Sequence, residues 1–269
     1  MAGPQATKED VELVREQLGL NKPLPQQYIS YVTGLVKGDL GTSLRTKRPV
    51  LTEVQGRYMN TVQLTLLSLT WSVIAGVLIG VWSGRNRSKW QDYTGMTGAV
   101  SGISKPSLWI GFMLIMVFAV KYRLLPTTGA GSFKNLILPS ITLGVSIAAI
   151  IARFTRSSVI EVLKEDYVRT ARAKGLREKT VIWKHVFRNC MISVVTVVGL
   201  QFGFLLGGSV VTETVFAFPG LGSLLIESVN YRDYPAIQSL ILIFSLHFVL
   251  INLVVDVLYA VLNPEIQLS

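Results

Sequence analysis

The chain has 269 residues, of which half are hydrophobic and only 16% are charged, and its mean hydropathy is +0.46. A soluble domain usually carries about 25% charged residues, so this composition argues against an ordinary soluble protein and indicates a membrane protein. The 26 basic residues exceed the 16 acidic ones, but most of them lie in loops beside apolar runs, which is typical of membrane topology and not of nucleic-acid binding.

Residues 1–57 form a polar head with eight basic and six acidic residues. Apolar positions at helical spacing predict one helix from Lys8 to Gly19 and a second, shorter one from Tyr28 to Val36. The run from Gly38 to Ser43 is typical of a turn. We interpret the head either as a small cap over the mouth of a pore or as a passive solvated segment.

Five stretches that are free or nearly free of charge follow the head. Each reaches the ~20 residues of a helical crossing or comes within two of it. Because a helix satisfies its own backbone in lipid, these stretches predict an all-α integral membrane protein with five transmembrane helices. The expected spans are residues 58–84, 94–120, 135–152, 189–212 and 234–262. They define a membrane domain over 58–264, and residues 265–269 form a short tail.

The basic residues of the loops predict which side of the membrane each loop faces. Residues 84–97 and 153–190 hold thirteen Lys and Arg, whereas residues 121–135 and 213–233 hold four. We therefore expect the first two loops and the C-terminus in the cytoplasm, and the polar head outside. No apolar helix precedes the head to carry it across, so a first span of six is expected to be missing. The alternative is that the later spans draw the head across.

Small residues recur at helical spacing in two of the spans. The glycines concerned are Gly76, Gly80 and Gly84 in the first span, and Gly199, Gly203 and Gly207 in the fourth. Such stripes let helix backbones approach closely in lipid, so we expect them at helix contacts. A second interpretation is that these smooth faces slide past each other during transport.

The last span carries a polar stripe on one helical face, formed by Asn252, Asp256, Tyr259 and Asn263. A carboxylate facing lipid is costly, so the stripe is expected inside the bundle or at the cytoplasmic boundary. Two roles for Asp256 stay open. It is either a proton-coupling group or an interfacial anchor bonded to a neighbouring helix.

The cytoplasmic loop over residues 153–188 is basic and helix-patterned. Apolar positions from Val159 to Ala171 extend the third span, Gly175 interrupts the pattern, and Thr180 is suited to cap a second short helix. The elbow between the two helices is formed by Arg169, Ala171, Arg172, Ala173, Lys174 and Gly175. Its small residues allow it to fit a groove of a partner, and its cations can bind acidic groups there. The alternatives are a docking surface for a separate cytoplasmic ATPase and an ordinary solvated loop.

Sites for catalysis or cofactors are not evident in the sequence. The chain has no GxxxxGK[ST] phosphate-binding loop, so nucleotide hydrolysis cannot be assigned to it. The soft metal ligands His185, His247 and Cys190 do not form a recognisable metal-binding motif, and the single cysteine excludes a disulfide framework. We therefore expect no cofactor, no metal and no enzymatic activity in this polypeptide.

Several motifs together resemble one known family. They are DYVRTARAKGLREKTVIWKHVFRN in the cytoplasmic loop, ETVFAFPGLGSLLIESV and RDYP between the last two spans, LVVDVLYAVLNPEI near the end and GDLGTSLRTKRPV in the head. The chain is similar to permease subunits of ATP-binding-cassette importers, in the dipeptide, oligopeptide, nickel and glutathione permease family. Within that family QFGFLLGGSVV and ARFTRSSVIEVL are most similar to glutathione importer permeases.

The resemblance implies a six-helix permease of the type I importer fold in a bacterial inner membrane, which moves its substrate by alternating access. The elbow from Arg169 to Gly175 is then the coupling segment. The outer mouth is expected at Phe218, Pro219, Gly220 and Asp233, with a short helix over Leu221 to Val229. The implied partners are a second homologous permease, two ATP-binding subunits and a periplasmic solute-binding protein. The implied substrates are di- and oligopeptides, with glutathione and then nickel as alternatives.

Two other classes of membrane protein remain as rivals. One is a secondary transporter that is driven by an ion gradient through Asp256. The other is a scaffold that transports nothing. A bound ATPase in the purified complex distinguishes the importer from both.

Overall fold

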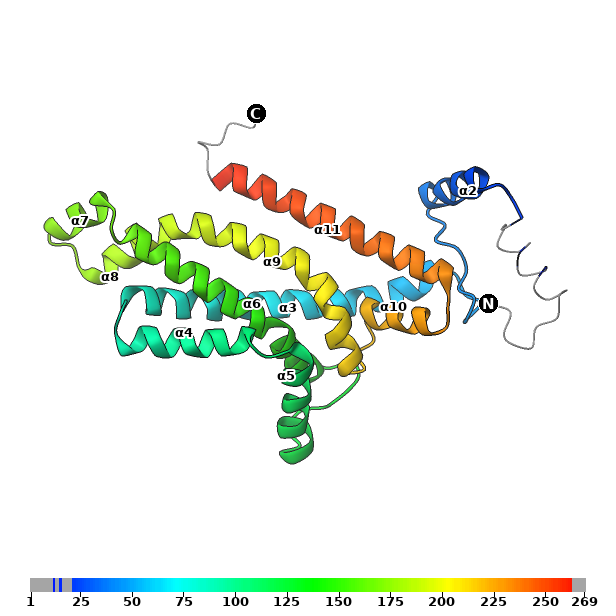
Figure 1. The fold of residues 1–269 in the computed structure, drawn as a ribbon, viewed down its shortest axis with the longest axis horizontal. Coiled ribbons are helices and arrows are strands. Elements are labelled where there is room, and N and C mark those ends of the chain that lie inside the picture. Colours follow the sequence, from blue (N-terminus) through cyan, green and yellow to red (C-terminus); the bar gives the residue numbers. More distant parts are fainter. Residues whose placement is uncertain (1–11, 13–14, 16–20, 263–269) are drawn as a thin grey trace.

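The computed structural model describes Glu12, Arg15 and residues 21–262, and this part of the chain is helical apart from its connections and one isolated β-bridge between Thr42 and Pro49. The protein is elongated, with the head at one end and the basic loop at the other (Figure 1). The all-α prediction is confirmed. The helix expected over Lys8 to Gly19 falls largely outside the described residues, whereas the one expected from Tyr28 is present.

The elements in chain order are α2 (Leu24–Val36), α3 (Val50–Arg85), α4 (Trp90–Ile103), α5 (Ser107–Leu114), a π-helical segment (Ile115–Lys121), α6 (Phe133–Val162), α7 (Asp166–Ala173), α8 (Glu178–Thr180), a second π-helical segment (Val181–Val186), α9 (Phe187–Val215), α10 (Leu221–Asn230) and α11 (Tyr234–Leu262). Among the described residues, three helices are long and apolar enough to cross a membrane alone: α3, α6 and α11. Two bent helix pairs raise the number to five if each pair is one span, which agrees with the five expected.

Two of the membrane helices are longer than the expected spans. Helix α3 begins directly after Pro49 and has 36 residues, so it is about 54 Å long and exceeds the ~30 Å hydrocarbon core. Helix α6 has 30 residues and continues well past the expected end at residue 152. Both helices therefore extend beyond the bilayer, and α6 joins the membrane region to the basic loop.

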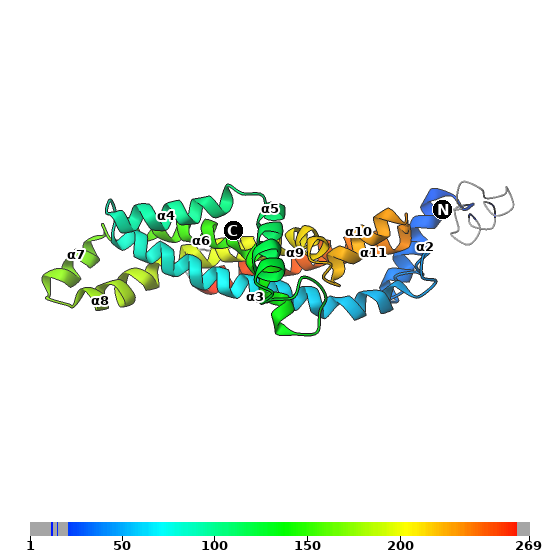
Figure 2. The same cartoon turned by 90° about the horizontal axis from the view of Figure 1, so that it is seen from below.

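The span expected over residues 94–120 is sharply bent. The chain bends by 100° between α4 and the segment Ser107–Lys121. The break lies at Pro106, which has no N–H to donate and disfavours helical backbone at the preceding residue. Helix α5 therefore runs away from the bundle in Figure 1, and it lies in front of α3 in Figure 2, which is the view from below.

The glycine stripe of α3 lies against α6. A Cβ atom on Gly80 would lie 2.5 Å from the Cβ of Thr155 and 2.7 Å from the carbonyl oxygen of Ala152, and Gly76 and Gly84 face α6 equally closely. Only part of the glycine stripe of α9 lies at a helix contact. Gly199 and Gly203 face α11, but nothing lies within 4 Å of a Cβ built on Gly207. The packing prediction is thus confirmed for α3 and for two glycines of α9.

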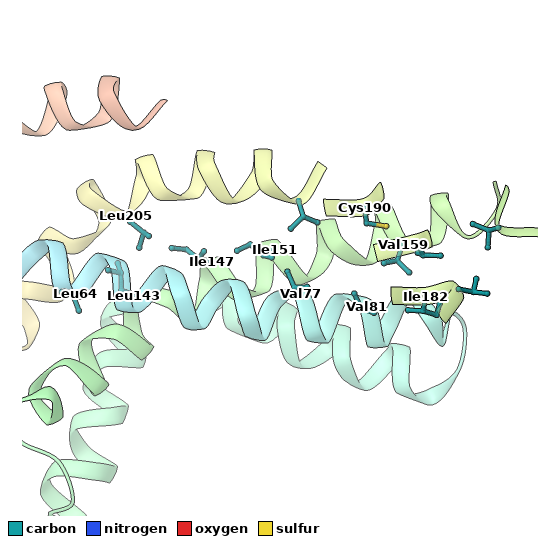
Figure 3. Packing of buried hydrophobic residues seen from close by; sticks show 14 of the residues in the cluster. Leu64, Val77, Val81, Leu143, Ile147, Ile151, Val159, Ile182, Cys190 and Leu205 are labelled. Carbon is teal, nitrogen blue, oxygen red and sulfur yellow. The ribbon is translucent and has the colours of Figure 1, made fainter. Parts of the chain in front are cut away.

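Buried apolar residues form a large core and a smaller outer core. The large core follows α3, α6 and α9 into the basic loop (Figure 3). The outer core joins the start of α3 to α10 and the start of α11 through Val50, Val54, Leu221, Leu224 and Leu240. Because α3 contributes to both cores, it connects the two ends of the molecule.

The Gly80→Ala substitution is expected to destabilise the protein by about 1–3 kcal/mol, because the added methyl group has no space between α3 and α6. The Gly98→Ala substitution on α4 is the matched control, since nothing lies within 4 Å of its Cβ. Thermal unfolding of the detergent-solubilised protein measures both. A Tm for Gly80→Ala equal to that of Gly98→Ala contradicts the close contact.

Candidate coupling loop and outer mouth

The basic loop is a folded element and not a slack connection. Helix α7 buries Val168 and Ala171, and the segment after α8 buries Val181, Ile182 and Val186. These side chains join the large core beside Val159 of α6 and Cys190 of α9; Figure 3 shows Val159, Ile182 and Cys190 together at this end. The buried face attaches the loop to two membrane helices at once.

The opposite face of the loop is exposed. It presents Arg169, Arg172, Ala173, Lys174 and Gly175 to solvent. Ala171 differs from the other residues of the expected elbow, because its side chain is only 5% exposed and packs inside the chain. It lies on the same face of α7 as Val168, three residues before it, so its side chain faces the core.

Gly175 makes the turn between α7 and α8. Its φ is +73°, in the left-handed region that favours glycine, and nothing lies within 4 Å of a Cβ built on it. Its N–H donates to the carbonyl oxygen of Arg172, which closes the end of α7. Glycine is therefore favoured here by the left-handed backbone conformation and not by a lack of space for a side chain.

An ion pair spans this turn. The guanidinium of Arg172 donates to both carboxylate oxygens of Glu178, at 3.2 and 2.8 Å. Both side chains are nearly half exposed, so the pair contributes little stability but fixes the relative position of α7 and α8. Sequence reasoning assigned Arg172 to a partner and missed Glu178. The available signal was an acid six residues further on, across a glycine turn.

Two more polar contacts hold the loop to the bundle. The side-chain amide of Asn189 donates to the Tyr167 hydroxyl at 2.7 Å, which links the start of α9 to α7. Nearer the membrane, Arg156 of α6 donates to both oxygens of Asp92, the third residue of α4, at 2.6 and 2.7 Å. Asp92 is buried, so this pair fastens α4 to α6 directly before the loop.

The expected outer mouth lies at the opposite end of the molecule (Figure 1). The short helix expected after Gly220 is present as α10. However, Phe218, Gly220 and Asp233 are buried, and the carbonyl oxygen of Pro219 accepts a hydrogen bond from Asn60 at 2.7 Å. These residues hold α10 in place, and their side chains do not line an open surface within this chain.

A buried carboxylate at the end of α9 was missed by the sequence analysis. Glu213 is fully buried and accepts hydrogen bonds from the Thr61 hydroxyl of α3 at 2.8 Å and from the N–H of Ser223 at 3.0 Å. It therefore caps the start of α10 and ties it to α3. The predicted fourth span ended one residue earlier, and an ionisable residue at that position was the available signal.

The far half of α10 is held by arginines. Glu227 accepts two hydrogen bonds from Arg57 of α3, at 3.0 and 3.1 Å, and pairs with Arg45 of the head at 3.1 Å. Burial alone raises the pKa of Glu227, but the hydrogen bond and charge of Arg57, and then those of Arg45, bring it below its ordinary value. Glu227 is thus kept ionised at neutral pH.

The polar stripe of the last span, expected inside the bundle or at the cytoplasmic boundary, is only partly described. Asn252 is half-buried beside Gly203, but Asp256 is exposed and makes no hydrogen bond to the described residues. The Tyr259 side chain and Asn263 lie outside the described part of the chain. An anchor bonded to a neighbouring helix of this chain is therefore not seen for Asp256.

An open apolar cavity of about 350 Å³ lies between α3, α9 and α11. Its lining is aliphatic and aromatic except for His247, whose Nε2 lies 2.6 Å from the Tyr58 hydroxyl. A peptide needs partners for its amide groups, and this cavity offers almost none. It is therefore not a peptide-binding site by itself.

The Arg156→Ala substitution is expected to lower the unfolding free energy by about 3 kcal/mol, because it leaves Asp92 buried without its partner. The control is Arg153→Ala on the same helix, where the arginine is exposed and has no ion pair among the described residues. Removing Asp92 as well should restore part of the loss. Thermal unfolding in detergent is the measurement, and equal effects of the two arginine substitutions contradict the assignment.

Comparison with solved structures shows the same fold. The chain is similar to the structure described as inward-facing conformations of the MetNI methionine ABC transporter, with a TM-score of 0.69 and 17% identity over 79% of this chain and 97% of the other. It is also similar to an amino acid ABC transporter with histidines, with a TM-score of 0.61 and 17% identity over 77% and 92% of the two chains. These likenesses show the type I importer permease fold.

Comparison of sequences shows the family. The chain is 55% identical over 267 residues to the glutathione transport system permease protein GsiC of Escherichia coli K12, covering 99% of this chain and 87% of that protein. The GsiC of Salmonella choleraesuis is 54% identical over the same shares. Residues 76–268 match the family of binding-protein-dependent transport system inner membrane components, and residues 1–65 match the N-terminal family of such membrane components. The chain belongs to this family and is a permease subunit of an ABC importer.

Proposed function

We propose that the chain carries short peptides inward across the membrane by alternating access, driven by ATP hydrolysis in two separate subunits. The observation that carries the proposal is the basic loop. It exposes a folded elbow on one face and is buried against α6 and α9 on the other. Such an element can transmit a displacement of the elbow to the membrane helices against which it is packed. An ordinary solvated loop needs no buried face.

The coupling role falls on the exposed residues of the elbow: Arg169, Arg172, Ala173, Lys174 and Gly175. Their position on a turn that is closed by the Arg172–Glu178 pair favours recognition as a rigid unit. Ala171 supports the elbow from beneath. ATP-driven approach of the motor subunits then moves α6, and the glycine contact between α6 and α3 passes the movement toward the outer end.

The pore is proposed to form with a second, homologous permease. Many of the described side chains of α11 are exposed, and the cavity beside this helix is apolar and open. A large apolar surface marks a contact with lipid or with another membrane protein. The substrate pathway is then shared between two subunits, and a periplasmic solute-binding protein delivers the peptide to the outer end, where Asp233 and α10 lie.

The substrate class rests on the relatives. Permeases that are 54–55% identical to this chain are named for glutathione transport, and glutathione is a tripeptide. Short peptides are therefore the proposed class, with glutathione as the first competitor to test. A nickel importer and an ion-coupled transporter that uses Asp256 are the alternatives.

The complete importer in proteoliposomes is expected to take up a radiolabelled dipeptide only when ATP and the binding protein are present. Collapse of the proton gradient should leave uptake unchanged, because the energy comes from ATP. The Asp256→Asn variant should transport normally. Competition with unlabelled glutathione and with Ni²⁺ then identifies the preferred substrate.

Three outcomes contradict this proposal. Uptake that persists without ATP, follows the proton gradient and is lost in Asp256→Asn indicates a secondary transporter. Uptake of Ni²⁺ but not of peptide rejects the substrate class. A purified complex that contains no ATPase rejects the importer mechanism.

The Gly175→Val substitution is expected to reduce peptide uptake several-fold more than ATP hydrolysis, because it forces the elbow out of its left-handed turn at a cost of about 1–2 kcal/mol. Asparagine tolerates this backbone region, so Gly175→Asn should retain most coupling. The ratio of peptide imported to ATP hydrolysed is the measurement. The control Gly131→Val changes another positive-φ glycine in a different loop. An unchanged ratio in Gly175→Val rejects the coupling role of this turn.

A further inference from the structure

The connection between α3 and α4 carries three exposed cations within five residues. Arg85 is the last residue of α3, Arg87 lies in the connection, and Lys89 directly precedes α4. None of the three side chains forms an ion pair with the described residues. We call these three residues the α3–α4 cluster.

The carboxylates that interact electrostatically with this cluster are already paired with other arginines. They are Asp92 and Glu178, which lie close enough to feel the charge of the cluster. Asp92 accepts two hydrogen bonds from the guanidinium of Arg156, and Glu178 accepts two from that of Arg172. Each negative charge is therefore balanced by its own guanidinium. The α3–α4 cluster leaves three positive charges at the surface.

The backbone that carries the cluster has a defined shape. Ser88 has φ +62°, in the left-handed region that residues other than glycine rarely adopt. Its N–H donates to the buried carboxylate of Asp92 at 3.1 Å, which holds this conformation. The side-chain amide of Asn86 donates to the carbonyl oxygen of Trp82 at 2.9 Å and closes the end of α3. Membrane topology requires cations in a loop but no particular loop conformation, so a topological role alone does not account for this shape.

Two tryptophans mark the depth of the cluster in the membrane. Trp82 lies three residues before Arg85, and Trp90 directly follows Lys89. Their rings meet edge to face with centroids 6.3 Å apart, and both side chains are exposed. Tryptophan is enriched at the boundary between hydrocarbon and headgroups. The phosphate groups of the surrounding lipids are therefore expected at the level of the α3–α4 cluster.

The basic loop extends farther along the molecule than the cluster does. Helix α6 contacts the start of α4 through Arg156 and then continues from residue 156 to residue 162, which is about 9 Å, before the loop begins. Figures 1 and 2 both show α7 and α8 beyond the connection between α3 and α4. A protein partner seated on the elbow is therefore farther from the bilayer than the cluster, whose exposed side is at headgroup level.

We propose that the α3–α4 cluster binds the phosphate groups of anionic phospholipids, with Trp82 and Trp90 against the adjoining part of the acyl chains. The inference goes beyond the proposed transport function and does not depend on it. Each Lys or Arg near an anionic lipid surface adds to the attraction, and a zwitterionic headgroup has no net charge to complement the cluster. A lipid bound here contacts the ends of both α3 and α4, beside the Asp92–Arg156 pair that fastens α4 to α6.

The test is a lipid titration of the full chain, purified in non-ionic detergent with the subunits that accompany it. Phosphatidylglycerol and phosphatidylcholine with the same acyl chains are the two probes, and native mass spectrometry measures their binding. The unaltered protein should bind phosphatidylglycerol more tightly. The triple variant Arg85→Gln/Arg87→Gln/Lys89→Gln should weaken phosphatidylglycerol binding at least about fivefold and leave phosphatidylcholine binding unchanged.

Two further variants control for net charge and for folding. The variant Lys164→Gln/Arg177→Gln/Lys179→Gln removes three exposed cations of the basic loop and should bind both lipids like the unaltered protein. The variant that exchanges lysine and arginine at the three cluster positions keeps the charge and should retain the preference for phosphatidylglycerol. Salt at 1 M, where exposed charges are screened over about 3 Å, should abolish the preference in the unaltered protein.

Four outcomes contradict the inference. Equal binding of the two lipids by the unaltered protein rejects an anionic site, and a preference that persists at 1 M salt rejects a site based on charge. Equal losses in the cluster variant and the loop variant indicate diffuse net charge. A cluster variant that binds phosphatidylglycerol normally but no longer co-purifies with an ATPase assigns the cations to that partner instead.

Discussion

Backbone contact between α3 and α6 connects the two ends of this molecule. Three glycines of α3 face α6 at distances that leave no space even for a methyl group, so the two helices meet over several turns. Helix α6 leads directly into the basic loop, and α3 reaches the outer core at Val50 and Val54. Lipid provides no hydrophobic force to drive two apolar helices together, and close packing of small residues replaces it. In the proposed importer mechanism, this contact is the route by which a displacement of the loop reaches the outer end.

Polar contacts hold the helices together at the edges of the apolar cores. Asp92 holds α4 to α6, Glu213 holds the start of α10, and Asp233 holds the turn over residues 43–48 of the head. Each carboxylate is buried, so each would be costly without its hydrogen-bond donors. Hydrogen bonds are directional, so these contacts fix the relative position of the elements more narrowly than apolar packing alone does. They divide the protein into a membrane region with a basic loop and an outer unit made of α10, the turn over residues 43–48 and the helix starts beside them.

The sequence predicted the features that depend on local pattern. Apolar runs located the membrane helices, glycine spacing located the α3–α6 contact, and the elbow at Gly175 followed from a single break in a helical pattern. Long-range pairs were not predictable in this way. Arg57 and Glu227 are 170 residues apart, and no spacing rule relates them. The bend at Pro106 was missed because apolar content was counted over residues 94–120 without regard to the proline.

The exposed face of the basic loop combines a fixed turn with both paired and unpaired cations, and Lys174 has no ion pair among the described residues. Arg172 is paired with Glu178, Arg169 lies 3.5 Å from Asp166, and Ala171 is buried. A partner at the proposed coupling elbow therefore meets a turn whose helices are already held by an ion pair, a left-handed glycine and buried apolar side chains. Binding to such a turn orders few side chains, which lowers the entropic cost of association. Rigidity is also what a lever requires, since a loop that deformed under load would absorb the displacement before it reached α6 and α3.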